Sequence, residues 1–213
     1  MKIIEDKKTS SLTVVILAGG KSSRVGLNKS KGQMKLTGRP LIDWVISKLT
    51  FLDNLTEEDI IIVGPKEKYP NFKRVVQDIF PQRGPLGGIF SGLKASNSQY
   101  NLLLGCDMPF IKVKLLQYMI ENINSYDIII PCYGKGLIEP LCAIYSKSCL
   151  KVIERNIRAG VLSVRKIFPY LKIRFIKEEE IKKFDAELYS FFNINLKHDF
   201  VKAEELIKKK GME

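Results

Sequence analysis

Residues 17–26, Leu-Ala-Gly-Gly-Lys-Ser-Ser-Arg-Val-Gly, follow the apolar run Val14-Val15-Ile16, which is typical of a buried strand. Gly19 and Gly20 permit backbone conformations that a side chain would prevent, and they let main-chain N–H groups approach an anion closely. Arg24 adds a forked donor that matches phosphate oxygens. A strand that leads into a glycine-rich, cationic loop predicts a phosphate-binding site, although a tight turn after a core strand explains the glycine pair alone equally well.

The loop matches neither of the two commonest nucleotide-binding motifs. The P-loop pattern G-x-x-x-x-G-K-[S/T] is not present, and neither is the G-x-G-x-x-G pattern of dinucleotide-binding folds. The kind of anion that binds here therefore has to be inferred from the remainder of the chain.

The size and composition indicate one sizeable domain. The chain has 213 residues, of which 45% are hydrophobic, and it contains no run of apolar residues long enough to span a membrane. Residues 1–11 are polar and lysine-rich and lack the apolar segment of a signal peptide. We interpret residues 1–11 as a flexible leader, residues 12–213 as a single domain, and the protein as cytoplasmic.

The net charge of +12 fits three kinds of partner: nucleic acid, an anionic membrane, or a phosphorylated small molecule. No nucleic-acid-binding motif accompanies the charge, and apart from Lys208-Lys209-Lys210 it is spread along the chain. We therefore interpret most of it as a solvated surface and expect neither nucleic acid nor a membrane as a partner.

The histidine and cysteine content limits the possible chemistry. The chain has one histidine, His198, which excludes multi-histidine metal sites and argues against serine or cysteine catalysis that depends on a histidine. The four cysteines lack the spacing of metal ligands and are expected to be buried, reduced thiols. Carboxylates, cations, backbone amides and a hard metal ion remain as catalytic groups.

Short apolar runs alternate with helical patterns, which predicts an α/β fold with a mostly parallel sheet covered on both faces. The strands are expected at 13–17, 60–63, 74–76, 101–104 and 127–130, and the helices at 40–50, 86–95 and 113–123. After residue 135 the pattern is mixed. It predicts strands at 138–145, 172–176 and 191–194, an interrupted helix at 150–171, and a closing helix at 200–210.

Asp107 follows the predicted strand 101–104 almost directly, so it is expected at the edge of the sheet where α/β folds bind ligands. Mg²⁺ favours one or two carboxylates together with substrate phosphates. Asp107 is the best candidate for such a ligand, and a helix N-cap before Pro109 is the alternative interpretation.

Three other positions near predicted strand ends are candidates. Gly87, within Gly84-Pro-Leu-Gly-Gly88, would leave backbone open to a ligand or allow close helix–sheet packing. Asp78 follows the strand 74–76 and would bind a nucleobase or ribose or cap a turn. Asn193 and Asn195 are two residues apart, so on a strand both would point the same way and could help to hold a metal–phosphate group, whereas simple turn chemistry is the alternative.

These motifs together resemble the molybdenum cofactor guanylyltransferases, the MobA-like proteins. The resemblance extends over about residues 12 to 207. It rests on Leu17-Ala-Gly-Gly-Lys-Ser-Ser-Arg-Val-Gly26, Lys31, Gly38-Arg-Pro-Leu41, Gly84-Pro-Leu-Gly-Gly88, Cys106-Asp-Met-Pro109, Glu139-Pro-Leu141 and Phe192-Asn-Ile-Asn195. The glycine loop is shared with other nucleotidyltransferases, whereas Gly84-Pro-Leu-Gly-Gly88 resembles the guanine-using branch.

The resemblance implies a Rossmann-like three-layer α/β/α sandwich that transfers GMP from GTP to the terminal phosphate of molybdopterin. It implies nucleotide contacts for Leu17, Ala18, Gly19 and Asp78, a phosphate contact for Lys31, Mg²⁺ and GTP contacts for Asp107, and a place near the cofactor for Asn193 and Asn195. From their own chemistry, Gly20 and Arg24 are expected to stabilise charge on the leaving pyrophosphate, and Gly87 to lie against the nucleotide. The phosphate-binding lysine is Lys31 when counted back from Gly38 and Lys29 when counted forward from Gly26. A family asparagine after the second strand corresponds to Gly64, so that contact is not expected.

Other functions of the same scaffold remain open at this point. Two are enzymes, a molybdopterin cytidylyltransferase or a sugar-phosphate nucleotidyltransferase, and one is a GTP-binding protein without turnover. The expected partners are GTP, molybdopterin, and chaperones or other proteins of cofactor biosynthesis.

Overall fold

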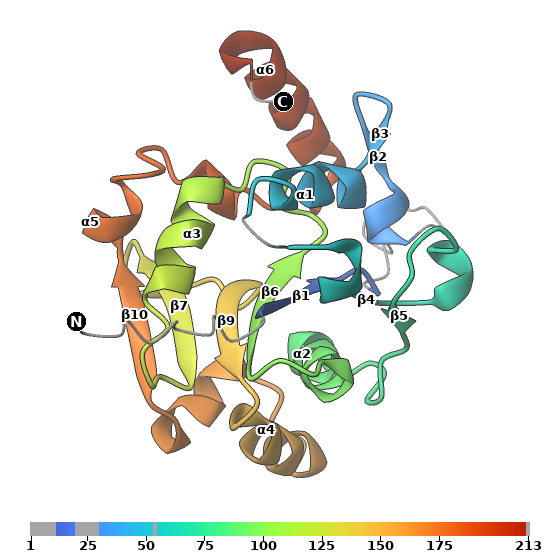
Figure 1. Ribbon diagram of the computed structural model, residues 1–213. Helices are drawn as coiled ribbons and strands as arrows, with labels where there is room; N and C mark the ends of the chain where they lie inside the picture. The colour runs from blue at the N-terminus through green and yellow to red at the C-terminus, as the bar shows by residue number, and fades with distance from the viewer. Residues whose placement is uncertain (1–11, 20–29, 53–54, 212–213) are drawn as a thin grey trace, which may run out of the picture.

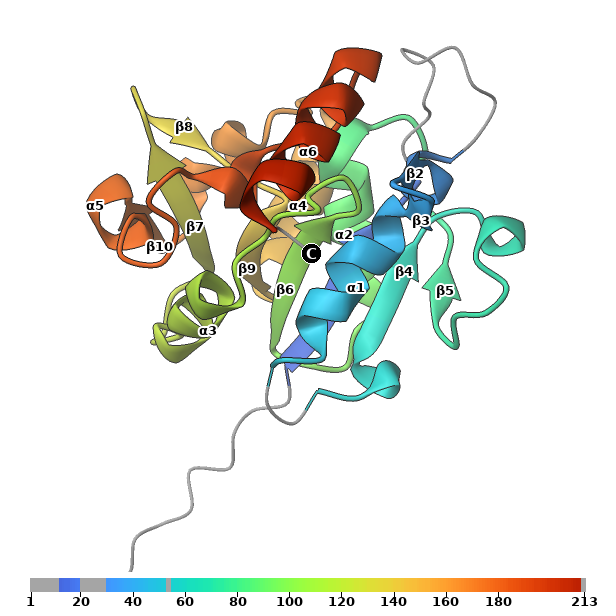
Figure 2. The ribbon, with the colours of Figure 1, turned by 90° about the horizontal axis from the view of Figure 1, so that it is seen from above.

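A computed structural model describes residues 12–19, 30–52 and 55–211 of the chain. Its described strands form an eight-stranded sheet and a separate two-stranded hairpin. The strands of the large sheet are β1 Leu12–Leu17, β4 Ile60–Val63, β5 Val75–Val76, β6 Tyr100–Gly105, β7 Ile128–Tyr133, β8 Leu137–Ile138, β9 Cys142–Ser146 and β10 Ile173–Lys177. They lie in the order β10-β7-β9-β6-β1-β4-β5 (Figure 1), with β8 beside β7 (Figure 2).

The sheet is mostly parallel, as predicted. β1 pairs in parallel with both β4 and β6, β5 continues the parallel pairing beside β4, and β10 is parallel to β7. β9 is antiparallel to its two neighbours, β6 and β7. The carboxyl ends of β1, β4, β5 and β6 therefore meet at one edge of the sheet, where open α/β sheets bind ligands.

Two layers of helices cover the sheet, which confirms the predicted three-layer sandwich (Figures 1 and 2). The helices are α1 Leu41–Leu49, α2 Gly84–Ala95, α3 Val113–Glu121, α4 Cys149–Arg158, α5 Glu178–Ile181 and α6 Lys197–Lys210. Side chains of a strand alternate between the two faces. Val14 and Ile16 of β1 accordingly share a buried cluster with α1 and α3, whereas Val15 belongs to the cluster of α2 and α4.

Helix α2 lies close to the central strand because glycines face the sheet. A Cβ atom at Gly92 would come within 2.3 Å of Val15 Cγ1, and one at Gly88 would come within 3.0 Å of Leu17 Cδ1. Close helix–sheet packing, one of the two interpretations of this glycine-rich segment, is therefore what the structure contains at these two positions.

A third buried cluster lies beside the hairpin of β2 Lys35–Leu36 and β3 Arg39–Pro40, and includes Leu36, Trp44 and Ala203 of α6. The sequence pattern does not predict this hairpin. Thr37 and Gly38 connect its strands with φ angles of 48° and 85°, the combination of a type I′ turn. Within the described residues, no helix has the length and apolar character needed to cross a lipid bilayer.

Several predictions for the second half of the chain are wrong. The strand expected at 191–194 is a 3₁₀ helix at Tyr189–Phe191 followed by irregular backbone. The strand expected at 138–145 is interrupted by a turn and forms β8 and β9. The helix expected at 150–171 ends at Arg158, before the left-handed Gly160, and a 3₁₀ helix follows at Val164–Tyr170.

Candidate functional site

A cavity of about 870 Å³ opens at the sheet edge where β1, β4, β5 and β6 end. It receives residues from the strand ends, from the start of α2 and from the 3₁₀ helix at Lys31–Gln33. The lining residues are Leu17, Gly19, Lys31, Val63, Gly64, Pro65, Glu67, Gln77, Asp78, Pro81, Gln82, Gly84, Pro85, Gly88, Cys106, Asp107 and Leu141. A space of this size accommodates a nucleotide-sized ligand.

Neighbouring backbone and one tyrosine fix the exit of β1 toward the glycine loop. Ala18 N donates to Val63 O at 2.9 Å, and the buried Tyr69 hydroxyl donates to Ala18 O at 2.9 Å. Burial raises the pKa of Tyr69, so this hydroxyl keeps its proton as a donor. Gly19 is exposed directly after these contacts and lines the cavity. These two hydrogen bonds thus hold Ala18 in place directly before Gly19.

The turn that carries Asp107 is held equally tightly. Cys106 N donates to Leu17 O at 3.3 Å, and Ile194 N donates to Asp107 O at 3.0 Å. Gly105 is required for close approach here, because a Cβ atom on it would come within 2.5 Å of Asp107 Oδ1. Burial first, and the charge of Asp107 second, raise the pKa of the Cys106 thiol, so this thiol stays protonated and is a poor nucleophile.

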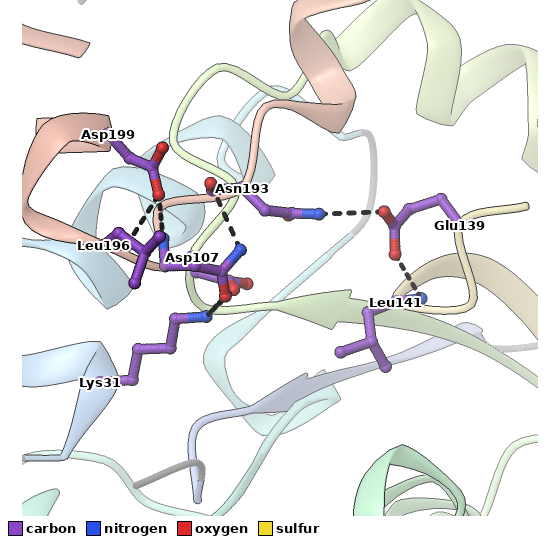
Figure 3. Close-up of polar contacts among 8 residues, drawn as sticks. Lys31, Asp107, Glu139, Leu141, Asn193, Leu196 and Asp199 are labelled. Atoms are coloured by element: carbon purple, nitrogen blue, oxygen red, sulfur yellow. Dashed lines mark hydrogen bonds and ion pairs between the residues drawn. The ribbon is translucent and has the colours of Figure 1, made fainter. Parts of the chain in front are cut away.

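Lys31 and Asp107 form an ion pair at the cavity (Figure 3). Their side chains are 19% and 13% exposed, so the pair is only partly open to solvent. Lys31 Nζ also donates to Asn195 Oδ1 at 2.7 Å. The structure thus brings together a cation, a carboxylate and an amide from three distant parts of the sequence.

A second polar group lies beside this cluster (Figure 3). Asn193 Nδ2 donates to Glu139 Oε2 at 3.0 Å, and Leu141 N donates to Glu139 Oε1 at 3.3 Å. Burial raises the pKa of Glu139, while these two hydrogen bonds partly oppose the rise. Asp199 Oδ2 accepts from Asn195 N and Leu196 N and so fixes the following segment at the start of α6.

Asp78 lines the far side of the cavity. Its Oδ1 accepts from Phe80 N at 3.0 Å and from Ser91 Oγ at 2.9 Å, whereas no described residue donates to its Oδ2. Gly87 packs beneath this loop, because a Cβ atom on it would come within 2.6 Å of Phe80 O and 3.2 Å of the Asp78 carboxylate. Gly87 is buried and does not line the cavity, and its contact with a nucleotide remains a prediction.

The donor set fits a hard cation that is shared with phosphate. Among the described residues, no group of three or more His, Cys, Asp or Glu side chains could hold a metal alone. One carboxylate, Asp107, contacts the Lys31 ammonium, which also reaches the amide oxygen of Asn195, and Asn193 lies two residues before Asn195. Mg²⁺ accepts such oxygen ligands when phosphates and water complete its octahedron.

The structure places most of the predicted site residues together. Leu17, Gly19, Lys31, Asp78 and Asp107 line the cavity, Ala18 lies buried behind it, and Asn193 and Asn195 join the polar cluster at its side. The two asparagines are not on a strand, so the predicted reason for their common direction is wrong. Gly20 and Arg24 lie outside the described residues, as does Lys29, the alternative phosphate-binding lysine.

Some residues of the site were not predicted. Gly64, for which no contact was expected, lines the cavity, and Tyr69 orients Ala18 from behind. Glu139 appeared in the sequence only as part of a motif, and Asp199 was not singled out. Glu-Pro-Leu at 139–141, directly before an apolar run, was the signal that could have drawn attention to Glu139.

The sequence matches known proteins over most of its length. The family model for the MobA-like NTP transferase domain matches residues 14–172. The chain is 35% identical over 200 residues to a molybdenum cofactor guanylyltransferase from Desulfosudis oleivorans, covering 93% of this chain and 96% of that protein. It is 36% identical over 203 residues to a probable molybdenum cofactor guanylyltransferase from Clostridium perfringens, with coverage of 93% and 97%.

Solved structures have the same architecture. The molybdopterin-guanine dinucleotide biosynthesis protein A from Archaeoglobus fulgidus superposes with a TM-score of 0.78 at 28% identity, covering 92% of this chain and 99% of that one. A 4-diphosphocytidyl-2C-methyl-D-erythritol synthase from Anaerococcus prevotii reaches 0.69 at 15% identity, with coverage of 94% and 97%. The second likeness concerns the fold alone.

Proposed function

Because this chain belongs to the molybdenum cofactor guanylyltransferase family, we propose that it transfers GMP from GTP to the terminal phosphate of molybdopterin and releases pyrophosphate. The chain is accordingly a nucleotidyltransferase, and its product is molybdopterin guanine dinucleotide. The observation that carries the proposal is the cavity at the end of β1, where Gly19 begins the glycine loop and Lys31 and Asp107 lie at the same edge.

The reaction is an in-line displacement at the α-phosphorus of GTP. A phosphate oxygen of molybdopterin forms the new P–O bond, and the bond to the β-phosphate breaks as pyrophosphate leaves. The attacking oxygen is already anionic, so the reaction needs no general base. This agrees with a chain whose one histidine, His198, is 61% exposed and pairs with Asp199.

The work of the protein is then to hold two anions close together and to neutralise charge on the leaving group. Lys31 donates to phosphate oxygens, and Gly19, exposed at the cavity, leaves its backbone accessible to the triphosphate. The free Oδ2 of Asp78 accepts from the base or ribose. Asp107, with the oxygens of Asn193 and Asn195, would hold Mg²⁺, which supplies positive charge to the phosphates when bound.

Several further parts of the proposal rest on the sequence and the family rather than on contacts. Gly20 and Arg24 continue the phosphate-binding loop, and Gly87 supports the nucleotide through the packing of the Asp78 loop. The reaction takes place in the cytoplasm, and the product passes to chaperones or other proteins of cofactor biosynthesis.

The test is a reconstituted reaction with purified protein, molybdopterin, Mg²⁺ and one nucleoside triphosphate at a time. Pyrophosphate release and the dinucleotide product are measured together. GTP should support turnover at least about 100-fold better than CTP, a ratio within reach of a site that hydrogen-bonds the base. Preference for CTP, or pyrophosphate release that needs a sugar phosphate, would contradict the assignment, and GTP binding without any transfer would identify a protein that has lost turnover.

A further inference from the structure

The carboxylate of Glu139 is hydrogen-bonded on both oxygens, and the proposed reaction assigns it no part. It lies outside the nucleotide cavity, in the turn between β8 and β9, and no lysine or arginine among the described residues pairs with it. Its oxygens instead accept one hydrogen bond each, from Asn193 Nδ2 and Leu141 N. Such a carboxylate, partly buried and without an ion-pair partner, is costly to retain.

The hydrogen bond from Asn193 determines which end of its amide is free. An asparagine amide has a donating NH₂ and an accepting oxygen, and a half-turn of the group exchanges them. An ionised carboxylate only accepts, so it admits the NH₂ and excludes the oxygen. Asn193 Oδ1 is left over, and no described residue donates a hydrogen bond to it.

Glu139 is itself fixed in a way that glutamine would not reproduce. Two donors, Asn193 Nδ2 and Leu141 N, each bind one of its two oxygens. A glutamine at this position would place an NH₂ against one of them. The carboxylate is therefore the side chain of this length that satisfies both neighbours at once.

Asn193 is held near Asp107 because the residue that follows it, Ile194, is hydrogen-bonded to Asp107. Ile194 N donates to Asp107 O at 3.0 Å, and Asn195 Oδ1 accepts from Lys31 Nζ at 2.7 Å. The amide that Glu139 orients is thus adjacent in sequence to a residue bonded to the predicted metal ligand.

We propose that Glu139 is a positioning residue that locks the Asn193 amide with its oxygen free, so that Asn193 serves as an acceptor toward the cation bound with the triphosphate. The inference rests on the proposed function for the identity of that cation and its nucleotide. Without the carboxylate the amide can also adopt the reversed orientation, which presents an NH₂ to the cation.

The test restores the hydrogen bond with its direction reversed. Glu139→Gln leaves Asn193 without a fixed orientation. In the double variant Glu139→Gln with Asn193→Asp, the new amide donates to the new carboxylate, its oxygen still accepts from Leu141 N, and position 193 again offers an oxygen. The matched control, Asn193→Asp alone, adds the same charge at the same position but sets it against the Glu139 carboxylate, so no hydrogen-bonded pair is rebuilt.

The primary readout is the affinity for Mn²⁺, measured by electron paramagnetic resonance with the α,β-methylene analogue of GTP. Glu139→Gln should weaken Mn²⁺ binding about 10-fold or more, the usual effect of removing a group that orients a metal ligand. The Glu139→Gln/Asn193→Asp variant should recover most of the loss, whereas Asn193→Asp alone, with two carboxylates facing each other, should bind Mn²⁺ no better than the unsubstituted protein. In turnover assays the loss in Glu139→Gln should fall on kcat, with the KM for GTP little changed.

Unchanged Mn²⁺ affinity in Glu139→Gln would overturn the inference, and so would a double variant that stays as defective as the single one. Thermal unfolding is recorded for every variant, and if Glu139→Gln fails to fold, the double variant with its rebuilt pair decides the question. Failure of the proposed function has a different signature. In that case the unsubstituted protein would show no guanylyl transfer to molybdopterin, whatever the Mn²⁺ measurements give.

Discussion

Lys31 and Asp107 form an ion pair with each other, although we propose that the first binds a phosphate and the second a metal ion. A third group, Asn195 Oδ1, holds the ammonium from the other side at 2.7 Å. The ammonium thus lies where a divalent cation would otherwise be attracted by the carboxylate. A cation that arrives with GTP must replace Lys31 at Asp107, and the released ammonium is then close enough to meet the phosphates.

Replacing Lys31 by methionine should therefore have opposite effects on two ligands. The affinity for GTP should fall about 10-fold, because a hydrogen bond between two charged groups is lost. The affinity for Mn²⁺ in the absence of nucleotide should rise, because no ammonium competes for Asp107. Calorimetry measures the affinity for GTP, and electron paramagnetic resonance measures the affinity for Mn²⁺. Lys35→Met, at an exposed position, is the control. An unchanged Mn²⁺ affinity would mean that the ion pair does not restrain Asp107.

Asp107→Asn should abolish most of the activity without unfolding the protein. The substitution keeps the shape of the side chain but removes the charge that the bound cation needs, so kcat/KM should fall at least about 100-fold. The side chains of Asp107 and Lys31 are only 13% and 19% exposed, so the loss of this ion pair should cost roughly 1–3 kcal/mol of stability. Steady-state kinetics and urea unfolding test both statements, with Glu154→Gln as a surface control. Full activity in Asp107→Asn would refute its role in binding the metal.

Gly105→Ala should damage catalysis through Asp107. The added methyl group would come within 2.5 Å of Asp107 Oδ1, so the carboxylate has to move. A displacement of this kind should lower kcat about 10- to 100-fold. The decisive comparison is the double variant with Asp107→Asn, which should be no worse than Asp107→Asn alone, because the two changes act on the same carboxylate. Additive losses would show that Gly105 acts elsewhere.

Gly92→Ala should instead destabilise the fold. Its methyl group would come within 2.3 Å of Val15 Cγ1 in the core, and overpacking of this kind costs about 1–3 kcal/mol. The gain in helix propensity, about 1 kcal/mol, offsets part of that cost. Combining Gly92→Ala with Val15→Ala makes room for the methyl group, so the double variant should be more stable than the sum of the two single losses predicts. Urea unfolding measures all four proteins, and strict additivity would contradict the proposed contact.

The α5–β10 corner should lose stability in acid. Burial disfavours ionised Glu180, but hydrogen bonds from Tyr118, Lys177 N and Arg174 outweigh it and lower the pKa of this carboxyl below its ordinary value of 4.5. Its contribution is therefore present above pH 4.5 and disappears as the pH falls through the lowered pKa. Glu180→Gln should be less stable than the unsubstituted protein at pH 7, by about 1 kcal/mol or less. The difference should shrink in acid, and a constant difference at all pH values would contradict the assignment.

The strand–helix order of the first half of the chain could be predicted because it depends on local patterns. Residues 60–63 are apolar throughout and form a strand that is buried on both faces, and Asp107 follows such a strand at the edge where ligands bind. The pairing of Lys31 with Asp107 could not be predicted, since the sequence does not say how the glycine loop returns to the sheet.

The strand predicted at 191–194 is wrong for a physical reason. Phe192-Asn-Ile-Asn195 alternates apolar and polar residues, the pattern of a half-buried strand. In the structure Ile194 is buried, but its N–H donates to Asp107 O instead of to a neighbouring strand. A single tertiary hydrogen bond takes the place of the series of hydrogen bonds that strand pairing would provide. The alternation of apolar and polar residues is the same in both arrangements and cannot distinguish them. Glu139 was missed for a similar reason, because its contact with Asn193 depends on how β9 is inserted between β6 and β7.

The hydrogen bond from Ile194 to Asp107 also has a consequence for biosynthesis. A ribosome that has just released residues 12–146 from its exit tunnel has produced every strand around the nucleotide cavity, but not the segment that closes the Asp107 turn. The nascent chain can therefore acquire the strands around the cavity before it acquires a complete reaction centre. A protein shortened before Tyr189 would keep the strands around the cavity but lack both this contact and the part of the third buried cluster that Ile194 and Ala203 supply, so catalytic competence is a late acquisition of this polypeptide.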